Sequence, residues 1–307
     1  MDILILLVGF SIGLVLLVKG ADEMVSSAVQ IALKFKLPSS IIGATFIGFG
    51  TSAPELFAST GAALKGDLDL GIGNIVGSNI ANSLLVVAVL YLALPKDFSQ
   101  KVKLNQISPV WMAILTTVFV STYVLTNEFP FLLGAVLLIL VIFVIYKMIS
   151  TESVDEGELL GEEKNYIWLR GGLSLLATLY GSQLVVDNAV AIAELFGVSS
   201  LIIGSTIIAI GTSLPEVAGT ISAAKMRKPD IVFGNIFGSN LFNIGLVGAT
   251  AIMISPGEIS SVIDYQLFIM YFVSFIVIFL SRNVIKRNSL LGYLFIVAYI
   301  LFLISLF

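Results

Sequence analysis

The sequence contains no cysteine and no histidine among its 307 residues. Without cysteine there is no disulfide framework, no thiol nucleophile and no thiolate metal site. Without histidine there is no imidazole ligand and no side chain whose ordinary pKa suits a proton relay near neutrality. Charged residues make up only 12% of the chain, whereas hydrophobic residues make up 58%. So little polar surface cannot cover a water-soluble globule of this size, which places the chain in a lipid bilayer.

Negative charge is concentrated in one stretch. The formal net charge of -4 comes largely from residues 152–163, so it indicates no nucleic-acid partner, and we expect none. The apolar residues 1–18 have no basic start and are followed by a poor cleavage site, so we expect a retained membrane helix rather than a signal peptide.

Long apolar stretches divide the chain. A bilayer core about 30 Å thick is crossed by a helix of about 20 mainly apolar residues. This criterion predicts an all-α integral membrane protein with ten transmembrane helices. The first and sixth stretches are long and contain a polar patch, so we expect them to be tilted or partly interfacial. The predicted spans are residues 3–33, 39–64, 69–94, 107–125, 129–148, 166–196, 200–224, 230–254, 263–281 and 289–306.

Lysine and arginine indicate the orientation. If both termini are external, the basic residues fall in cytoplasmic loops, except for Lys65 and for Lys19 inside the first helix. The positive-inside rule favours this arrangement. We therefore predict a multi-pass protein of the cell (plasma) membrane with extracellular termini. An acidic cytoplasmic linker, 150–165, then joins a first five-helix repeat, 1–149, to a second, 166–307.

Two polar motifs recur at one fixed offset. Residues 50–55 read GTSAPE and residues 211–216 read GTSLPE, an offset of 161 (216 minus 55). The same offset pairs GNIVGSNIAN at 73–82 with GNIFGSNLFN at 234–243. Two distinct polar motifs repeated without a gap inside apolar helices indicate an internal duplication. Because each half has an odd number of spans, the sequence predicts inverted repeats related by an axis in the membrane plane.

Each copy of the first motif ends in a glutamate, Glu55 or Glu216, inside an apolar span. An unpaired charge at that depth costs about 3 kcal/mol on insertion scales, so each glutamate marks an ion pathway or a bound ion. Lys19, the one lysine inside a span, cannot neutralise both carboxylates. A bound cation is the simpler counter-charge.

Proline and glycine precede each glutamate. Pro54 and Pro215 lack an N–H and clash with the carbonyl four residues back. We therefore expect both helices to break and the carbonyls of Gly50 and Gly211 to be free. Irregular backbone is tolerated at membrane depth where it lines a cavity.

Hydroxyl and amide groups accompany the two glutamates. Hydroxyls precede each glutamate by four and three residues, which is one helical face if the turn is helical, and a serine and an asparagine in the next span share a face. Together these groups form an all-oxygen set that suits Ca²⁺ and Na⁺, whereas softer metals prefer cysteine or histidine. For the hydroxyls, the alternative is a bond to the carbonyl four residues back. The residues are Thr51, Ser52, Ser78, Asn82, Thr212, Ser213, Ser239 and Asn243.

Other polar residues of these spans have structural interpretations. Asn79 and Asn240 point off the face that carries the ligand asparagines, so interhelical packing is expected of them. Asp22, Glu23 and Asp187 are candidates for ion entry, but near helix ends or interfaces such groups are more often simply solvated.

At these motifs the sequence resembles the cation/Ca²⁺ exchanger superfamily, whose repeats carry G-T-S-x-P-E and G-N-x-x-G-S-N signatures. It is most similar to the prokaryotic Na⁺/Ca²⁺ exchanger branch, over the whole chain. The resemblance implies a central Ca²⁺ site at Glu55 and Glu216 with backbone oxygens of Thr51 and Thr212. It implies that the first and sixth helices slide to expose this site alternately. It also implies flanking Na⁺ sites at Gly48, Ser52, Ser78, Ala209, Ser213 and Ser239, with Asn82 and Asn243 in the middle.

One position departs from part of the superfamily. Some prokaryotic members and the K⁺-dependent branch carry aspartate at the position of Asn243, whereas this chain has asparagine there and at Asn82. Fewer carboxylates leave less negative charge for an extra cation, which disfavours K⁺ co-transport.

The sequence thus predicts a monomeric antiporter in the lipid bilayer that exchanges Ca²⁺ for Na⁺, with these transported ions as its only cofactors. The alternative is an H⁺/Ca²⁺ or other cation/Ca²⁺ antiporter, because two buried glutamates can carry protons. A cation channel also tolerates acidic rings, but channels usually gain symmetry about an axis along the membrane normal. An enzyme is not expected, since no base is placed to activate Ser52 or Ser213.

Overall fold

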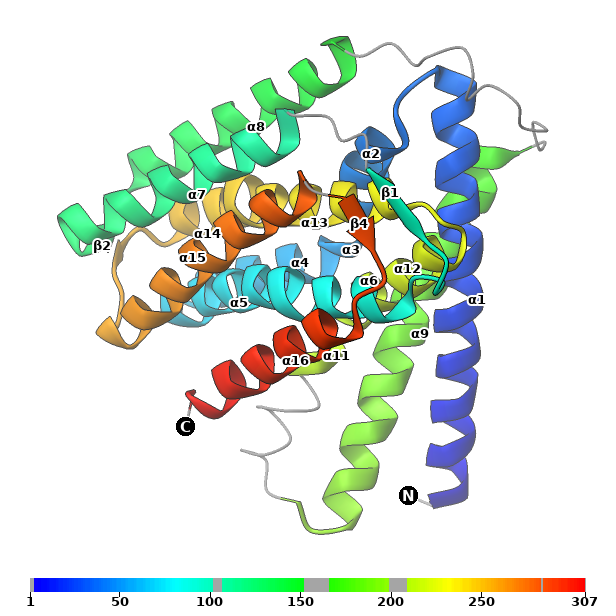
Figure 1. Cartoon of the computed structure of the whole chain (residues 1–307). Helices are drawn as coiled ribbons and strands as arrows, with labels where there is room; N and C mark the ends of the chain where they lie inside the picture. Colours follow the sequence, from blue (N-terminus) through cyan, green and yellow to red (C-terminus); the bar gives the residue numbers. More distant parts are fainter. Residues whose placement is uncertain (1–2, 102–106, 152–165, 199–208, 283, 307) are drawn as a thin grey trace.

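The computed structural model describes residues 3–101, 107–151, 166–198, 209–282 and 284–306, which are almost entirely helical (Figure 1). Seven of the described helices are long and apolar enough to cross a membrane, and one bent pair makes an eighth span. The chain is therefore a multi-pass α-helical membrane protein. The number ten stays a prediction, because the last helix has only 16 residues and the seventh predicted span includes 200–208, which lie outside the described residues.

The first half of the chain begins with a long helix and continues with a bent span and three further spans. Their bounds are α1 (Ile3–Phe35), α2 (Ser39–Ile42), η1 (Gly43–Ile47), α3 (Gly48–Thr51), α4 (Ala53–Leu64), α5 (Leu68–Ala81), η2 (Asn82–Val86), α6 (Val87–Ala93), α7 (Ile107–Thr126) and α8 (Phe131–Thr151). The second half follows the same order where it is described. Its helices are α9 (Ile167–Leu195), α11 (Ala209–Gly211), α12 (Leu214–Lys225), α13 (Pro229–Phe242), η5 (Asn243–Gly248), α14 (Ala249–Ile254), η6 (Ser261–Ile263), α15 (Asp264–Ser281) and α16 (Ser289–Ile304).

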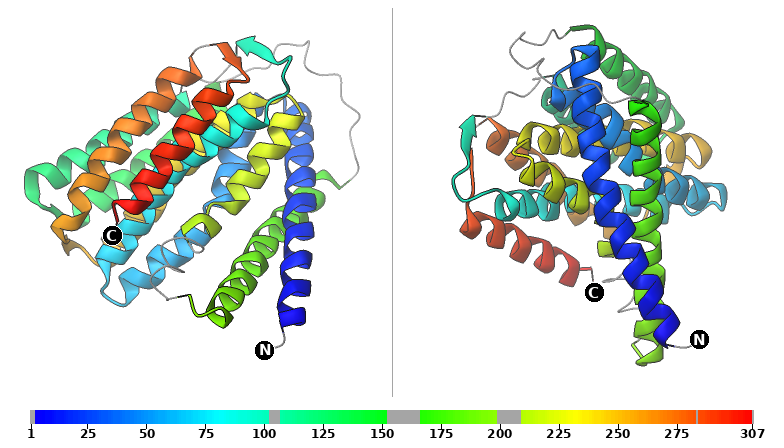
Figure 2. Two further views of the ribbon diagram at one scale, coloured as in Figure 1. Left: turned by 60° about the horizontal axis from the view of Figure 1, so that its bottom comes forward. Right: turned by 90° about the vertical axis from the view of Figure 1, so that its right-hand side faces the viewer.

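Helices α1 and α9 run side by side in opposite directions at one edge of the molecule (Figures 1 and 2). A methyl group on Gly20 would lie 2.7 Å from the backbone nitrogen of Thr178, and one on Gly181 would meet the backbone of Leu17. Such close approach of two backbones requires residues without a side chain. The contact is reciprocal, because Gly20 and Gly181 lie 161 residues apart, as do Leu17 and Thr178.

The centre of the molecule is formed by two continuous spans, α5 to α6 and α13 to α14. Their most apolar windows are 78% and 83% buried, compared with 22% for α1 and for α9. Each central span contains a π-helical segment, which starts at Asn82 in one and at Asn243 in the other. Segments of this kind are frequent at functional sites. The asparagines predicted from the motif are therefore placed in the core rather than towards lipid.

The predicted all-helical class is confirmed, and the described chain adds only four strands of two or three residues. Two short antiparallel ribbons join loops of the two halves: β1 (Ser99–Lys101) with β4 (Val284–Lys286), and β2 (Glu128–Phe129) with β3 (Gly257–Glu258). Where the helices end, the backbone N–H and C=O groups still need partners, and pairing between loops provides them.

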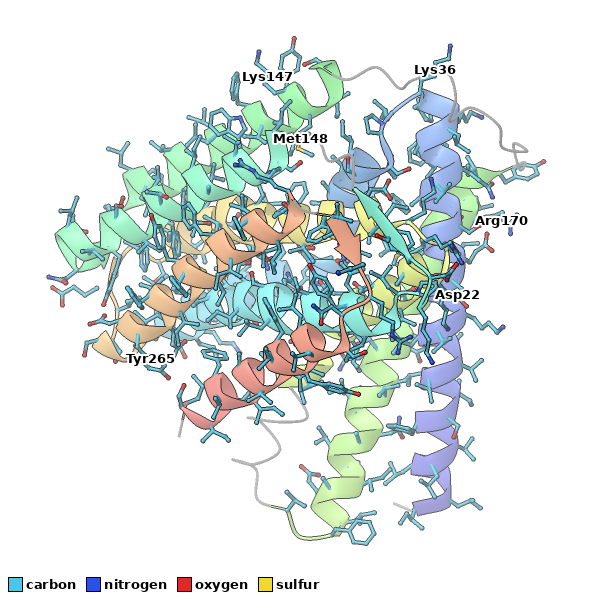
Figure 3. The ribbon with its side chains drawn as sticks, viewed as in Figure 1. Asp22, Lys36, Lys147, Met148, Arg170 and Tyr265 are labelled. Carbon is cyan, nitrogen blue, oxygen red and sulfur yellow. The ribbon has the colours of Figure 1, made fainter. Side chains whose placement is uncertain are left out.

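Basic side chains gather at one end of the molecule. In Figure 3, Lys36 and Lys147 lie at the top of the view and Arg170 at its upper right, whereas Tyr265 lies at the lower left. Between the loops that follow α6 and α12, the Arg227 guanidinium donates to Asp97 at 2.6 Å and thereby lowers the pKa of that carboxyl. The upper end is therefore the one that the sequence predicts to be cytoplasmic.

Candidate cation site

The helix that carries Glu55 is broken immediately before it. The axes of the segments Ser39–Thr51 and Ala53–Leu64 differ by 45°, and Ser52 between them has φ -83° and ψ 1°. In the second half, Ser213 precedes α12 with nearly the same angles, φ -92° and ψ 1°. The break is therefore confirmed, and the condition for a shared helical face of Thr51, Ser52 and Glu55, a continuous helical turn, is not met at Ser52.

The serines at the two breaks are N-cap residues without a cap bond. An N-cap hydroxyl normally accepts from the N–H of the second or third helical residue. At both breaks the second residue is proline, and neither Ser52 nor Ser213 makes the side-chain bond. The Oγ atom of Ser52 is buried without any hydrogen-bond partner. Its lone pairs are thus available to another ligand.

Both glutamates are buried in the protein interior. Glu55 is 3% exposed and Glu216 is 2% exposed, and the two carboxylates lie within electrostatic range of each other. Ser78 Oγ donates to Glu55 Oε1 at 3.3 Å, while the Oε2 atom of each glutamate has no partner. In the described part of the chain, no lysine or arginine pairs with either carboxylate. Two buried carboxylates in this state require a bound cation or a proton.

The threonine beside the first break differs from threonines elsewhere in the membrane helices. Thr45, Thr116 and Thr122 each donate to the carbonyl four residues back, at 2.7 to 2.8 Å. The Oγ1 atom of Thr51 is buried and makes no such bond. The structural alternative of bonding to the backbone therefore does not apply to Thr51, nor to Ser52.

The backbone carbonyls near the breaks are partly occupied. Ser239 Oγ donates to the carbonyl of Gly48 at 3.2 Å, which brings these two predicted site residues together across the halves. Ser182 Oγ on α9 donates to the carbonyl of Gly211 at 3.1 Å. The expectation that Gly211 keeps a free carbonyl is therefore wrong. The sequence repeat could not predict this bond, because the residue that matches Ser182 in the first half is Ala21, which has no hydroxyl.

The asparagines of the second motif pair across the two halves. Asn82 Nδ2 donates to Asn240 Oδ1 at 3.1 Å, and Asn243 Nδ2 donates to Asn79 Oδ1 at 3.0 Å. Asn79 and Asn240 thus have the interhelical role that the sequence predicts for them. The Oδ1 atom of Asn243 remains buried without a partner.

Three residues that were not predicted as site residues, Asn74, Ser59 and Asn235, make hydrogen bonds to or beside predicted site residues. Asn74 Nδ2 donates to Ser59 Oγ at 2.9 Å and to the backbone carbonyl of Glu55 at 3.5 Å. At the matching position in the second half, Asn235 Oδ1 accepts from Ser239 Oγ at 3.3 Å. Both asparagines belong to the repeated G-N dipeptide, so their recurrence was the available signal.

A cavity of about 390 Å³ lies between α9 and the two breaks. Its wall includes Pro54, Pro215 and Thr212; Pro215 is buried, and Pro54 and Thr212 are half-buried. The α9 wall carries Asp187 and Glu194. Asp187 is exposed there and accepts from Gln183 Nε2 at 2.7 Å, so its role in ion entry stays a prediction. The remaining predicted site residue, Ala209, begins α11 directly after the undescribed residues 199–208.

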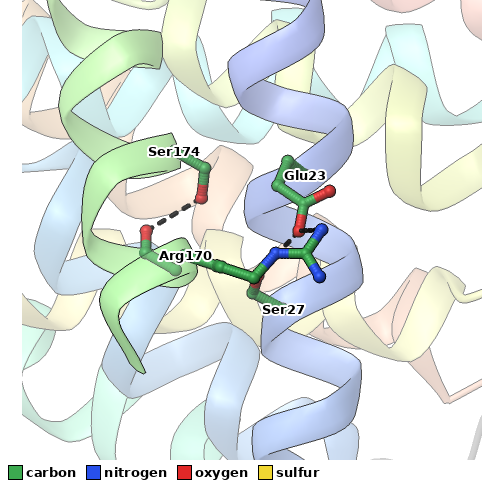
Figure 4. A network of polar contacts seen from close by, with 5 residues as sticks. Glu23, Ser27, Arg170 and Ser174 are labelled. Atoms are coloured by element: carbon green, nitrogen blue, oxygen red, sulfur yellow. Dashed lines mark hydrogen bonds and ion pairs between the residues drawn. The ribbon is translucent and has the colours of Figure 1, made fainter. Parts of the chain in front are cut away.

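Glu23 lies apart from this cavity and is also not simply solvated. Arg170 Nη2 lies 2.7 Å from Glu23 Oε1, and Ser27 Oγ donates to the same oxygen at 3.5 Å (Figure 4). The pair joins α1 to α9 and is half exposed, with side-chain exposures of 36% for Glu23 and 39% for Arg170. It ties these two helices together towards their upper ends.

Comparison with known proteins places the chain in a family. The model of the sodium/calcium exchanger protein family matches residues 5–151 and 166–307. This chain belongs to that family. It is 39% identical over 263 residues to the putative antiporter CaxA of Alkalimonas amylolytica, which covers 81% of each chain. It is 31% identical to the sodium/calcium exchanger MaX1 of Methanosarcina acetivorans, over 96% of this chain and 97% of that protein.

The fold agrees with this membership. The sodium-calcium exchanger NCX_Mj, in a crystal soaked with Na⁺ and Sr²⁺, superposes with a TM-score of 0.84 over 100% of both chains at 28% identity. The resemblance to prokaryotic Na⁺/Ca²⁺ exchangers predicted from the two motifs is thereby confirmed. The protein is a membrane-embedded cation/Ca²⁺ exchanger, and the family is one of transporters rather than of enzymes.

Proposed function

We propose that this exchanger moves Ca²⁺ against Na⁺ by alternating access to one site between Glu55 and Glu216. The observation that carries the proposal is the pair of buried carboxylates, each with an unpartnered oxygen and, among the described residues, without a basic partner. One divalent ion neutralises both, and so do two or more monovalent ions. Ions that compete for the same carboxylates cannot occupy them together, which couples the two fluxes.

The proposed ligands are oxygen atoms from both halves, a set that suits hard cations. Carbonyl oxygens at the end of a half-helix, such as α3, commonly coordinate Na⁺ in transporters. Ca²⁺ is assigned to the two glutamates with Thr51 and Thr212. Na⁺ is assigned to Gly48, Ser52, Ser78, Ala209, Ser213 and Ser239, and Asn82 and Asn243 line the space between. No organic cofactor is part of this proposal.

We also propose that residues 1–149 and 166–307 are inverted repeats joined by the linker 150–165, with five spans each. Three pairs of elements support the duplication, since α4 and α12, α5 and α13, and η2 and η5 start 161 residues apart. The opposite directions of α1 and α9 support the inversion (Figure 2). The proposed unit of transport is the monomer.

The cavity beside α9 supports a direction of access. It lies along the lower half of α9, at the end of the molecule where the chain begins (Figure 1). The positive-inside rule assigns that end to the outside of the cell membrane. We therefore propose extracellular termini and a site that faces outwards in this conformation. A slide of α1 and α9 over the other helices then exposes the site to the cytoplasm.

Uptake of ⁴⁵Ca²⁺ into proteoliposomes tests the proposal. Vesicles loaded with Na⁺ should take up ⁴⁵Ca²⁺ as Na⁺ leaves, and Glu55→Gln or Glu216→Gln should abolish uptake. Glu258→Gln, at an exposed position of the short strand β3, is the matched control and should transport normally. Equal uptake driven by a pH gradient without Na⁺ would support the H⁺-coupled alternative. Uptake by Glu55→Gln at the wild-type rate would contradict the assignment of the ion site to Glu55.

A further inference from the structure

A chain of three buried side chains runs from the proposed site to α15. Asn243 Nδ2 donates to Asn79 Oδ1 at 3.0 Å, and Asn79 Nδ2 donates in turn to Met270 Sδ at 3.6 Å. All three residues are at most 1% exposed. The chain ends at the methionine, so this contact decides how the two amides are oriented.

A thioether sulfur accepts hydrogen bonds but cannot donate one. Asn79 must therefore turn its NH₂ group to Met270, which leaves its oxygen facing Asn243. Asn243 must then use its own NH₂ group for that contact. If Asn243 turned over, two amide oxygens would face each other, and if both residues turned over, the Asn79 oxygen would face the sulfur. The Asn243 oxygen is therefore fixed on the opposite side, where it has no partner in the protein.

The corresponding series of hydrogen bonds, which starts at Asn82, ends differently. Asn82 Nδ2 donates to Asn240 Oδ1 at 3.1 Å, and Asn240 Nδ2 donates to Ser83 Oγ at 3.2 Å. A serine hydroxyl both donates and accepts. Both amides can therefore turn over together, with Ser83 then donating to Asn240, and every bond of the chain is kept. This chain holds Asn82 in place without deciding whether its oxygen or its NH₂ group faces the site.

We propose that Asn79 and Met270 are positioning residues that hold the Asn243 amide with its oxygen towards the transported cation. This inference rests on the proposed function, because it requires Asn243 to line the ion site. A cation binds the oxygen of an amide and is repelled by its NH₂ group. Loss of the fixed orientation should therefore weaken cation binding without removing any ligand. The hydrogen-bond chain of Asn82 ends at the Ser83 hydroxyl rather than at a thioether, so the two central asparagines differ in how firmly their oxygens are presented.

Apparent Ca²⁺ affinity measures this effect, by Ca²⁺-dependent thermal stabilisation of the purified protein and by the Ca²⁺ dependence of ⁴⁵Ca²⁺ uptake. Asn79→Leu should raise the Ca²⁺ concentration for half-maximal effect about fivefold, the equivalent of one neutral hydrogen bond. The maximal uptake rate should change much less. Met270→Leu keeps the volume and removes only the acceptor, so it should shift affinity in the same direction. Ser83→Ala is the matched control, and its affinity should stay within about twofold of the wild type, because Ser83 does not fix an orientation.

A double-mutant cycle separates positioning from general packing. If Asn79 acts through Asn243, Asn79→Leu should have no further effect on Ca²⁺ affinity in an Asn243→Ala background. An undiminished effect in that background, or equal effects of Met270→Leu and Ser83→Ala, would overturn the inference. Failure of the proposed function would look different: wild-type protein would bind Ca²⁺ but show no Na⁺-driven uptake, and the thermal measurement would still test the positioning.

Discussion

The upper half of α1 and the lower half of α9 occupy matching positions, 161 residues apart, yet they pack very differently. In α1, Met24, Val25 and Ala28 are completely buried, and the Met24 side chain lies against Gly219 of α12. In α9, the residue that matches Val25 is Val186, and it lines the cavity of about 390 Å³. The sequence is repeated here, whereas the packing is not.

Under the proposed alternating access, this difference allows one fold to serve two access states. Helix sliding of the kind described as shear keeps packed surfaces in contact while it opens one side and closes the other. In the conformation seen here the α1 side is closed and the α9 side is hollow. In the opposite state, we expect the two matching segments to exchange environments, so that the cavity lies beside Val25.

The largest expected effect is a contrast in chemical labelling between two matched valines. The protein has no native cysteine, so a single-cysteine variant reports only its own position. A membrane-impermeant thiol reagent added from outside should modify Val186→Cys rapidly, because the side chain lines the cavity. It should leave Val25→Cys unmodified, since that position is 0% exposed. Labelling is measured as the mass of the modified protein over time.

The labelling experiment also sharpens the comparison. Ionic conditions that favour the opposite access state should slow modification of Val186→Cys. In inside-out vesicles, the same conditions should expose Val25→Cys to the reagent. Equal labelling of both positions from outside would show that the packing difference between the two segments does not exist in the membrane.

The next largest effect concerns the crossing of α1 and α9. A methyl group at Gly181 would meet the backbone of Leu17, so Gly181→Ala should destabilise the protein by about 1 to 3 kcal/mol. Gly172 lies on the same helix with nothing within 4 Å of an added methyl group. Gly172→Ala should instead be neutral or stabilise by up to about 1 kcal/mol, because alanine favours a helix over glycine. Thermal unfolding in detergent measures both, and a shift of the same sign in the two variants would contradict the tight crossing.

The smallest effect is expected at the ion pair of Figure 4. Both partners are more than one-third exposed, and such pairs contribute about 0.2 to 1 kcal/mol. Glu23→Gln, Arg170→Gln and the double variant form a cycle whose coupling energy in thermal unfolding should fall in that range. A much larger coupling would mean that the two helices depend on this pair rather than on their glycine crossing.

The sequence predicted the positions of the central helices well, because two signals coincide there. Apolar length placed spans at 39–64, 69–94 and 230–254, within one residue of the observed ends. Pro54 and Pro215 then marked the two breaks, since proline removes a donor whatever surrounds it. Local chemistry of this kind can be read without knowledge of the fold.

Contacts between distant spans were not predictable in the same way. The repeat contains three asparagines in each half, but it could not show that Asn82 pairs with Asn240 and Asn243 with Asn79, because that depends on how α5 and α13 meet. The hydrogen bond from Ser182 to the carbonyl of Gly211 has no counterpart in the first half, so the sequence repeat could not predict it. The cavity arises from a difference between halves that are alike in sequence, and no single-sequence pattern encodes such a difference.

The π segments at Asn82 and Asn243 have a consequence for the rotational phase of the central helices. One additional residue in a turn rotates everything that follows by about 100° around the helix axis. In both central spans the rotation begins where the polar motif ends. The motif can therefore face the middle of the molecule, while the apolar residues beyond it point to a different side than a regular helix would give them. Both central spans carry this rotation. A deletion that restored a regular helix in only one of them would therefore rotate the apolar residues of that span alone, and the two spans would no longer present matching faces.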